Sequence, residues 1–306
     1  MLINRTTQPM SLIVGASGMV GSQMLADLGA ASTLATSRQQ RAGWLTLDLA
    51  DLETPSQAAA ILDEHILSAV YCVGGMTYVD GCEAQPELAW RVNARGPGVL
   101  AKYARSRKLP FVYYSTEYVF GGSQQTPGPY LETSPTCPLS VYGKTKLEGE
   151  QRVSAAHPDA LIVRTTVVYG PDPGKKNYLY TLLRNLAAGT VVKVAEDQVS
   201  TPTYNRDLVR ATLGLVESGA RGVFHVCGPE RMGRLEFAHK IAAKFRLNAS
   251  LLVGVPTKDL CQTAPRPLLA GLGIQKLRAL YPALTMHTVT DSLDDCAWEI
   301  DSSVVE

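Results

Sequence analysis

The stretch Leu12-Ile-Val-Gly-Ala-Ser-Gly-Met-Val-Gly21 decides the fold class of this 306-residue chain. A short apolar β-forming run leads directly into three glycines, and a helix-like pattern follows over Gly18–Leu28. Glycines let a pyrophosphate approach the backbone closely, and a helix N-terminus offers unbonded N–H groups and a positive dipole end. Taken alone, such a string also fits an ordinary turn. Its position at the start of an alternating chain favours a dinucleotide site at Gly15, Ser17, Gly18, Met19 and Val20.

The rest of the chain alternates short β-rich runs with longer helix-like stretches. This alternation predicts an α/β fold, a Rossmann-type doubly wound parallel sheet with helices on both faces. After Tyr169 the alternation weakens. We therefore expect a dinucleotide-binding domain over 1–170 and 203–228, and a smaller, mainly helical substrate-binding region over 171–202 and 229–306. The expected strands are Leu12–Val14, Thr33–Thr36, Trp44–Leu47, Ala69–Val73, Pro110–Tyr114, Leu161–Arg164 and Gly222–Val226, and the expected helices are Gly18–Leu28, Pro55–Leu67, Pro86–Arg107, Val141–Ala156 and Asn205–Glu217.

Composition excludes several classes of partner. The 29 basic and 28 acidic residues give a net charge of +1, which provides no broad positive field for nucleic acid. The six cysteines lack zinc-site spacing, so no metal is expected, and scattered thiols fit a reducing cytoplasm. The first apolar run, Ser11–Val14, is too short for a signal-peptide core or a membrane span. These features predict a cytoplasmic protein without a nucleic-acid or membrane partner.

The residues after the second expected strand indicate which dinucleotide binds. NAD-selective folds place an acid there to hold the ribose 2′-hydroxyl, whereas this chain has Thr36-Ser-Arg38. An arginine suits a 2′-phosphate, so NADPH is favoured, with NADH as the other option. The alternative is that Arg38 is a solvated loop charge. Asp48 and Leu49 follow the third expected strand and are placed to meet the adenine, although Asp48 also fits a helix N-cap.

A proton-transfer site is indicated by Tyr142-Gly-Lys-Thr-Lys146, which puts a Tyr and a Lys on one face of a helix. A nearby ammonium stabilises phenolate, so such a Tyr can donate a proton to an alkoxide as hydride arrives from a nicotinamide. Ser115-Thr116 ends an expected strand, and its hydroxyls can hold a carbonyl oxygen. A surface helix would be the ordinary explanation of the Tyr–Lys spacing alone. The order of glycine loop, strand-end Ser/Thr and Tyr-x-x-x-Lys is far more specific.

At these residues the chain resembles an extended short-chain dehydrogenase/reductase, and within that group the dTDP-4-dehydrorhamnose reductase family. The similarity runs from Leu12 to about Ala279. It includes Tyr114-Ser-Thr-Glu-Tyr-Val-Phe-Gly121, Tyr142-Gly-Lys-Thr-Lys-Leu-Glu-Gly-Glu150, Thr77-Tyr-Val-Asp-Gly-Cys-Glu83, Val92-Asn-Ala94, Arg164-Thr-Thr-Val-Val-Tyr169 and Arg266-Pro267. The resemblance implies NADPH-dependent reduction of the 4-keto group of a nucleotide-linked 4-keto-6-deoxy sugar.

The resemblance also implies individual roles. Tyr142 would be the proton donor with Lys146 as its partner, and Lys146 would also bind the cofactor ribose. Thr116 would polarise the keto group. The remaining implied contacts are Ser115 and Glu117 with the sugar, Gly75, Met76 and Thr77 with the nicotinamide ribose, and Asn177 and Arg266 with the nucleotide diphosphate. The chain departs from the family pattern at Cys72-Val-Gly-Gly75, at Glu117 in place of Asp, and at Val167 in place of Trp.

Two other functions stay open at this point. The regulatory β subunit of methionine adenosyltransferase shares most of these motifs and binds NADP as a partner subunit, not as an enzyme. A sugar-nucleotide epimerase or dehydratase that retains NAD is the third candidate, against which the absent acid near Arg38 argues. The apolar spacing of Val289–Ile300 fits docking on the body of the protein or on a second subunit, which leaves a homodimer open.

Overall fold

The computed structural model describes residues 8–304, and its central feature is a seven-stranded sheet in the order β11-β6-β5-β4-β1-β2-β3. The β1 strand pairs in parallel with both β2 and β4, so the chain reverses its winding between β1 and β4. This order confirms the predicted Rossmann-type α/β fold. The strands are β1 (Met10–Val14), β2 (Thr33–Ser37), β3 (Leu45–Thr46), β4 (Leu67–Cys72), β5 (Phe111–Thr116), β6 (Leu161–Thr165) and β11 (Gly222–His225).

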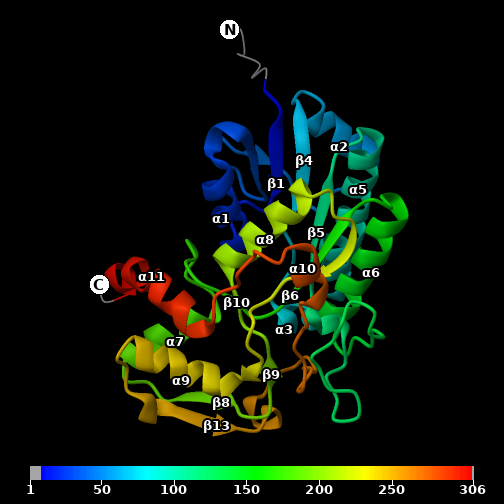
Figure 1. The fold of residues 1–306 in the computed structure, drawn as a ribbon. Coiled ribbons are helices and arrows are strands. Elements are labelled where there is room, and N and C mark those ends of the chain that lie inside the picture. Colours follow the sequence, from blue (N-terminus) through cyan, green and yellow to red (C-terminus); the bar gives the residue numbers. More distant parts are fainter. Residues whose placement is uncertain (1–7, 305–306) are drawn as a thin grey trace. The chain divides into compact units, whose positions relative to one another are not determined.

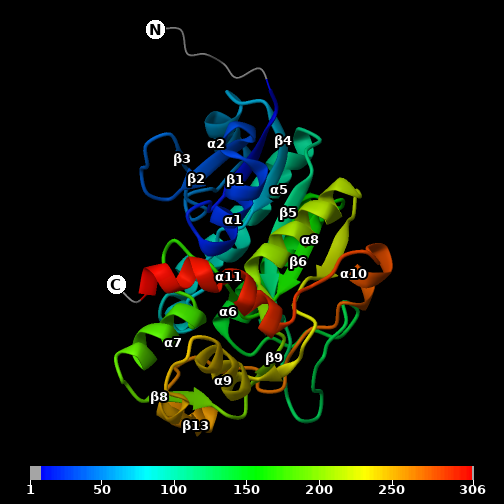
Figure 2. The ribbon, with the colours of Figure 1, turned by 60° about the vertical axis from the view of Figure 1, so that its left-hand side comes forward.

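Helices cover both faces of this sheet (Figure 1). The α1 helix (Met19–Leu28) lies on one face, and α2 (Pro55–Leu62), α5 (Gly96–Ser106) and α6 (Val141–Ala156) lie on the other (Figure 2). Thr54 starts α2 with a reciprocal capping box to Gln57. The predicted helix Pro55–Leu67 is too long, because α2 ends at Leu62 and β4 already begins at Leu67.

The predicted helix Pro86–Arg107 is present as one continuous helical stretch whose type changes along its length. It consists of α4 (Pro86–Trp90), a π-helical segment η2 (Arg91–Arg95) and then α5. Pro97 has no N–H to offer the carbonyl four residues earlier, that of Asn93. The Tyr113 hydroxyl of β5 donates to this carbonyl instead, at 2.6 Å. The proline therefore frees one helix carbonyl for a contact from the sheet, and it is the sequence signal for the π-helical segment.

The α6 helix packs directly on this helix. A Cβ at Gly149 would overlap with the Asn93 carbonyl oxygen and with the Tyr113 hydroxyl. Glycine is therefore required there, and its small size brings α6 against η2 and β5. The core beneath contains fully buried side chains from β1, β4 and β5, among them Leu12, Val70 and Tyr113.

The described residues form two compact units. The first contains the described residues up to Ser115 together with Val141–Val163 and Leu213–Val223; the second contains Thr116–Ser140, Arg164–Thr212 and the described residues from Phe224. The units divide the chain differently from the predicted ranges, because 116–140, 164–170, 203–212 and 224–228 belong to the second unit. Segment 116–140 is held there by a bridge between Tyr130 and Leu272. The assignment of cofactor and substrate binding to the predicted ranges stays a prediction.

The second unit combines helices with short strand pairs. In Figure 2, α9 (Arg234–Lys244) lies against the parallel pair β8 (Val192–Ala195) and β13 (Leu252–Val255), and α7 (Tyr178–Ala187) and α11 (Val289–Val304) pack on α9. None of the described helices is both long and apolar enough to cross a membrane. The remaining elements are α3 (Val79–Ala84), α8 (Asn205–Glu217), α10 (Gln275–Leu280), β7 (Val168–Tyr169), β9 (Val199–Ser200), β10 (Thr203–Tyr204), β12 (Met232–Gly233) and the short 3-10 helices η1 (Ala30–Ser32), η3 (Glu117–Val119), η4 (Ala249–Leu251) and η5 (Thr257–Leu260).

Candidate active site

The glycine loop lies where β1, β2 and β4 end. Gly15 has a φ of +89°, and a Cβ there would come within 2.6 Å of the Gly74 Cα. The Gly15 N–H donates to Thr36 Oγ1 at 3.4 Å, and the Ala16 N–H donates to the Thr36 carbonyl at 3.1 Å. These contacts bring the carboxyl ends of three parallel strands together at the point of reversed winding, where ligands of such folds bind.

The start of α1 fits a dinucleotide pyrophosphate. Gly18 is the N-cap of this helix and makes no side-chain capping bond. A Cβ at Gly18 would meet only the Gly15 carbonyl, at 3.6 Å, and both Ser17 and Gly18 are exposed. The N-cap position therefore places no side chain over the first turn of α1. This arrangement suits an anion on the helix N-terminus.

The predicted adenosine-side residues lie around this loop. Arg38 directly follows β2, is exposed, and has no ion pair with a described residue. The Asp48 carboxylate accepts the Ala50 N–H at 2.9 Å, so it closes a local turn. Leu49 is buried beneath this turn. Contacts of these three residues with a cofactor stay predictions.

Asn93 holds the loop that follows β4. Its Oδ1 accepts the Met76 N–H at 2.8 Å, and its Nδ2 donates to the Met76 carbonyl at 3.1 Å and to Thr145 Oγ1 at 3.2 Å. A Cβ at Gly75 would lie 3.1 Å from Asn93 Oδ1 and 3.8 Å from Lys146 Nζ. The structure therefore places Gly75 and Met76 beside Lys146, with exposed Thr77 next in the chain. Asn93 belongs to the motif Val92-Asn-Ala94, from which no role was predicted for it.

The Tyr–Lys pair lies on the inner face of α6. Tyr142 is 9% exposed and Lys146 5% exposed, so the surface-helix explanation is wrong. The carboxylate of Glu83 accepts the Val141 N–H at 2.8 Å and so anchors the first turn of the helix. This anchor comes from α3, far away in sequence, and holds the residue just before Tyr142.

Lys146 sits in a partly polar pocket of the first unit. Its Nζ donates to the Tyr114 carbonyl at 2.5 Å and lies 4.2 Å from the centre of the Tyr113 ring. Burial lowers the pKa of Lys146 to about 8, although Cys72, Glu150 and Cys82 act to raise it. Lys146 is therefore still mainly an ammonium at neutral pH.

Of the two hydroxyls that end β5, Ser115 is turned toward α6. Its Oγ donates to Glu150 Oε1 at 2.5 Å, and both residues are buried. The predicted contact of Ser115 with substrate therefore competes with a bond inside the protein. Thr116 Oγ1 accepts the Tyr118 N–H at 3.2 Å, which leaves its hydroxyl hydrogen to be donated.

Glu117 belongs to the second unit and is 3% exposed. Thr166 donates its hydroxyl to Glu117 Oε1, and the Gly271 N–H donates to Oε2 at 2.9 Å. Burial raises the pKa of Glu117 to about 7, against the opposing effect of these two donors and of Arg234 and Arg231. The structure thus gives Glu117 a framework role in addition to its predicted sugar contact.

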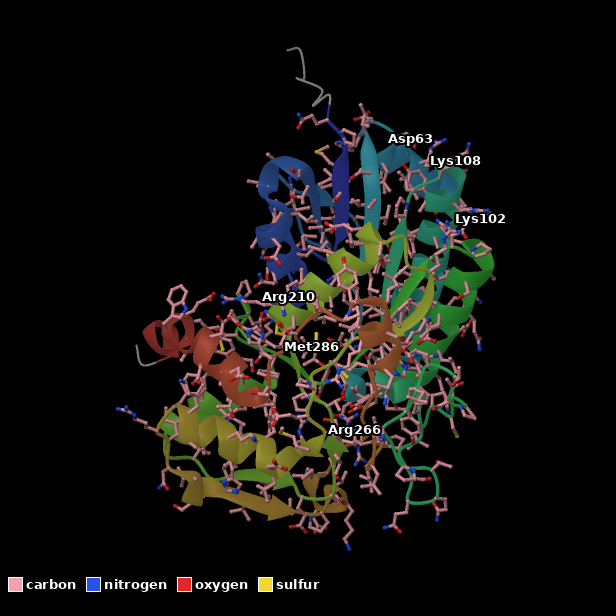
Figure 3. The ribbon with its side chains drawn as sticks, viewed as in Figure 1. Asp63, Lys102, Lys108, Arg210, Arg266 and Met286 are labelled. Atoms are coloured by element: carbon pink, nitrogen blue, oxygen red, sulfur yellow. The ribbon has the colours of Figure 1, made fainter. Side chains whose placement is uncertain are left out.

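The two residues predicted to meet the nucleotide diphosphate also lie in the second unit. Asn177 is the N-cap of α7, where its Oδ1 accepts the N–H groups of Leu179 and Tyr180 and its Nδ2 donates to the Gly170 carbonyl. Arg266, labelled in Figure 3, is half-buried. The nucleotide contacts of both residues stay predictions.

A cavity of about 290 Å³ lies at the opposite edge of the parallel strands, at the start of β5 and β6. Arg105 and Arg221 line it, and each binds Asp159 at 2.6 Å. Lys108 also lines the cavity. Lys102, on α5 itself, is exposed (Figure 3). This cavity has no part in the glycine-loop site, because the two lie at opposite ends of the strands.

The chain is similar to known proteins along most of its length. The profile of the family described as RmlD substrate binding domain matches residues 10–301. A probable low-salt glycan biosynthesis reductase of Haloferax volcanii is 33% identical, over 84% of this chain and 87% of its own. A dTDP-4-dehydrorhamnose reductase of Mycobacterium tuberculosis is 34% identical, over 92% and 95%. The crystal structure of dTDP-4-dehydrorhamnose reductase from Bacillus anthracis in complex with NADP superposes with a TM-score of 0.85 at 27% identity, over 95% and 99%.

Proposed function

The chain belongs to the RmlD substrate binding domain family, and from this premise we propose that it is an NADPH-dependent reductase of a sugar-nucleotide ketone. The family resemblance inferred from the motifs is thereby confirmed. The substrate is the 4-keto group of a nucleotide-linked 4-keto-6-deoxy sugar, as in the dTDP-4-dehydrorhamnose reductases that this chain resembles. The observation that carries the proposal is the buried Tyr142–Lys146 face of α6 beside the loop at Gly75.

The residues that would hold NADPH all lie in the first unit. Gly15, Ser17 and Gly18 would hold the pyrophosphate at the start of α1, Arg38 would bind the 2′-phosphate, and Lys146 would bind the nicotinamide ribose. When bound, NADPH supplies the hydride that reduces the keto carbon. Asn93 supports this site by holding the Met76 backbone on both of its polar groups.

The protein's own residues supply the proton. Tyr142 donates its phenolic proton to the oxygen that gains negative charge as the keto carbon is reduced. Lys146, whose pKa is lowered to about 8 and which is still mainly an ammonium at neutral pH, stabilises the resulting phenolate and provides a route for its reprotonation. Thr116 donates its hydroxyl hydrogen to the same substrate oxygen and orients it.

We also propose that the protein is cytoplasmic and that it forms a homodimer. Its binding partner is the sugar-nucleotide substrate. All six cysteines are free thiols, which suits a reducing compartment. Light scattering on the purified protein measures the assembly state, and a monomer would contradict this part of the proposal.

The decisive assay mixes the purified protein with NADPH or NADH and a set of dTDP-linked 4-keto-6-deoxy sugars. We expect steady oxidation of NADPH and a sugar product reduced at C4. Tight NADPH binding without turnover, together with binding to methionine adenosyltransferase, would instead establish the regulatory-subunit function. Sugar conversion without net NADPH consumption would establish the epimerase or dehydratase.

A further inference from the structure

A third ionisable residue continues the Tyr142–Lys146 face of α6. Glu150 follows Lys146 by four residues, which places the two side chains one turn apart on the same side of the helix. Glu150 is 4% exposed, and its Oε1 accepts the Ser115 hydroxyl at 2.5 Å. Removing the charge of a carboxylate from water costs free energy, so buried carboxylates are normally paired with a cation or hydrogen-bonded.

We propose that Glu150 is a positioning residue that holds the end of β5 through Ser115 and keeps Lys146 in its ammonium form. The proposal rests on the proposed function in one respect, since it assigns the held ammonium to the reduction. The positions of Ser115, Glu150 and Lys146 belong to one compact unit and stand independently of that function.

The groups around Lys146 leave this role to Glu150. Cys72 faces it from β4, Cys82 from α3, Tyr113 from β5, and Tyr142 and Glu150 share its helix. Burial raises the pKa of Cys72 to about 12 and that of Cys82 to about 11, and it raises the pKa of Tyr113 well above 10. These groups are neutral at physiological pH. Glu150 is the carboxylate of this set, so it supplies the negative charge that opposes the desolvation of Lys146.

The Ser115 bond has a second consequence. The Lys146 ammonium donates a hydrogen bond to the carbonyl of Tyr114, the residue just before Ser115 in β5. The Glu150 carboxylate therefore holds β5 at Ser115, next to the carbonyl group that binds Lys146. Loss of the hydroxyl would loosen the strand end at Thr116, the residue proposed to orient the substrate oxygen.

The test is Glu150→Gln, whose amide oxygen still accepts the Ser115 hydroxyl but carries no charge. The matched control is Glu148→Gln on the same helix, which is partly exposed and bonded to Arg152. Lysine residues carrying ¹³C at Cε are titrated by NMR in the cofactor-free protein, and the Lys146 signal is identified by its loss in Lys146→Met. We expect the titration midpoint of Lys146 to fall by about one pH unit in Glu150→Gln. It should stay unchanged in the control.

Activity gives a second readout. In Glu150→Gln the high-pH limb of the kcat profile should shift to lower pH by about one pH unit, as the Lys146 midpoint does. The KM for the sugar nucleotide should change little. Glu150→Asp restores the negative charge, so its Lys146 titration midpoint should lie close to the wild-type value. An unchanged Lys146 midpoint in a folded Glu150→Gln overturns the proposal, as does a Glu150→Asp variant that behaves like Gln.

Ser115→Ala covers the case in which Glu150→Gln does not fold. It keeps the carboxylate and removes one hydrogen bond, so the Lys146 midpoint should stay near its wild-type value while kcat falls about fivefold. Wild-type kcat in Ser115→Ala would overturn the proposal. If the wild type reduces none of the sugars, the proposed function fails, whereas the NMR titration still decides the role of Glu150.

Discussion

Lys146 in the first unit and Glu117 in the second are both buried ionisable groups, and burial shifts both toward the neutral form. The pKa of Lys146 falls to about 8 from 10.5, and that of Glu117 rises to about 7 from 4.5. Their surroundings differ. Lys146 contacts the Tyr114 carbonyl within its own compact unit and lies one turn from Tyr142 on its helix. Glu117 binds Thr166 and Gly271, which lie 49 and 154 residues further along the chain.

This difference separates two uses of buried charge. A lysine on a rigid helix, one turn from a tyrosine, is placed for proton chemistry, and its removal should change rate more than folding. A carboxylate that joins three distant segments holds loops together, so its removal should change folding first.

Tyr142→Phe tests the chemical side of the comparison. The ring and its packing remain, but the proton for the substrate oxygen is gone, so kcat should fall by about 10²–10⁴-fold. NADPH affinity, followed by fluorescence titration, should change little. Thermal unfolding serves as the control for folding. Wild-type turnover in this variant would disprove the assigned role of Tyr142.

Glu117→Gln tests the framework side. Because the folded pKa of about 7 is raised above 4.5, the protonated carboxyl favours the folded state below pH 4.5, and this contribution is lost as pH rises through 7. The loss is on the order of 3 kcal/mol in the free energy of unfolding. The Gln variant should lack this part of the pH dependence in urea unfolding between pH 4.5 and 7.5. Glu236→Gln, an exposed change on α9, is the control. Equal pH dependence in wild type and Glu117→Gln would refute the framework role.

Arg38→Asp tests a charge that is exposed, unlike the two buried groups. It replaces attraction with repulsion at the 2′-phosphate, so the preference for NADPH over NADH should fall by roughly tenfold. The effect should shrink in high salt, which screens exposed charges. Lys102→Asp makes the same charge change on α5 and should leave the preference intact (Figure 3). Equal affinity of the wild type for both dinucleotides would contradict the NADPH assignment.

The local features of the fold were predictable because each depends on neighbours in the chain. An apolar run followed by Gly15, Ser17 and Gly18 defines a strand, a turn and a helix start within ten residues. The four-residue spacing of Tyr142 and Lys146 places both on one helix face whatever surrounds the helix. Pro97 also carried a readable signal for the π-helical segment within the predicted helix.

Tertiary structure alone decided which atoms meet across long separations in sequence. Asn93 clamps Met76 across 17 residues, Glu150 reaches Ser115 across 35, and Glu117 reaches Gly271 across 154. No periodic pattern records these contacts, because a polar residue looks the same in sequence whether it faces water or a buried partner. Burial itself shifts the pKa values of Lys146 and Glu117, and burial exists only after distant segments have packed.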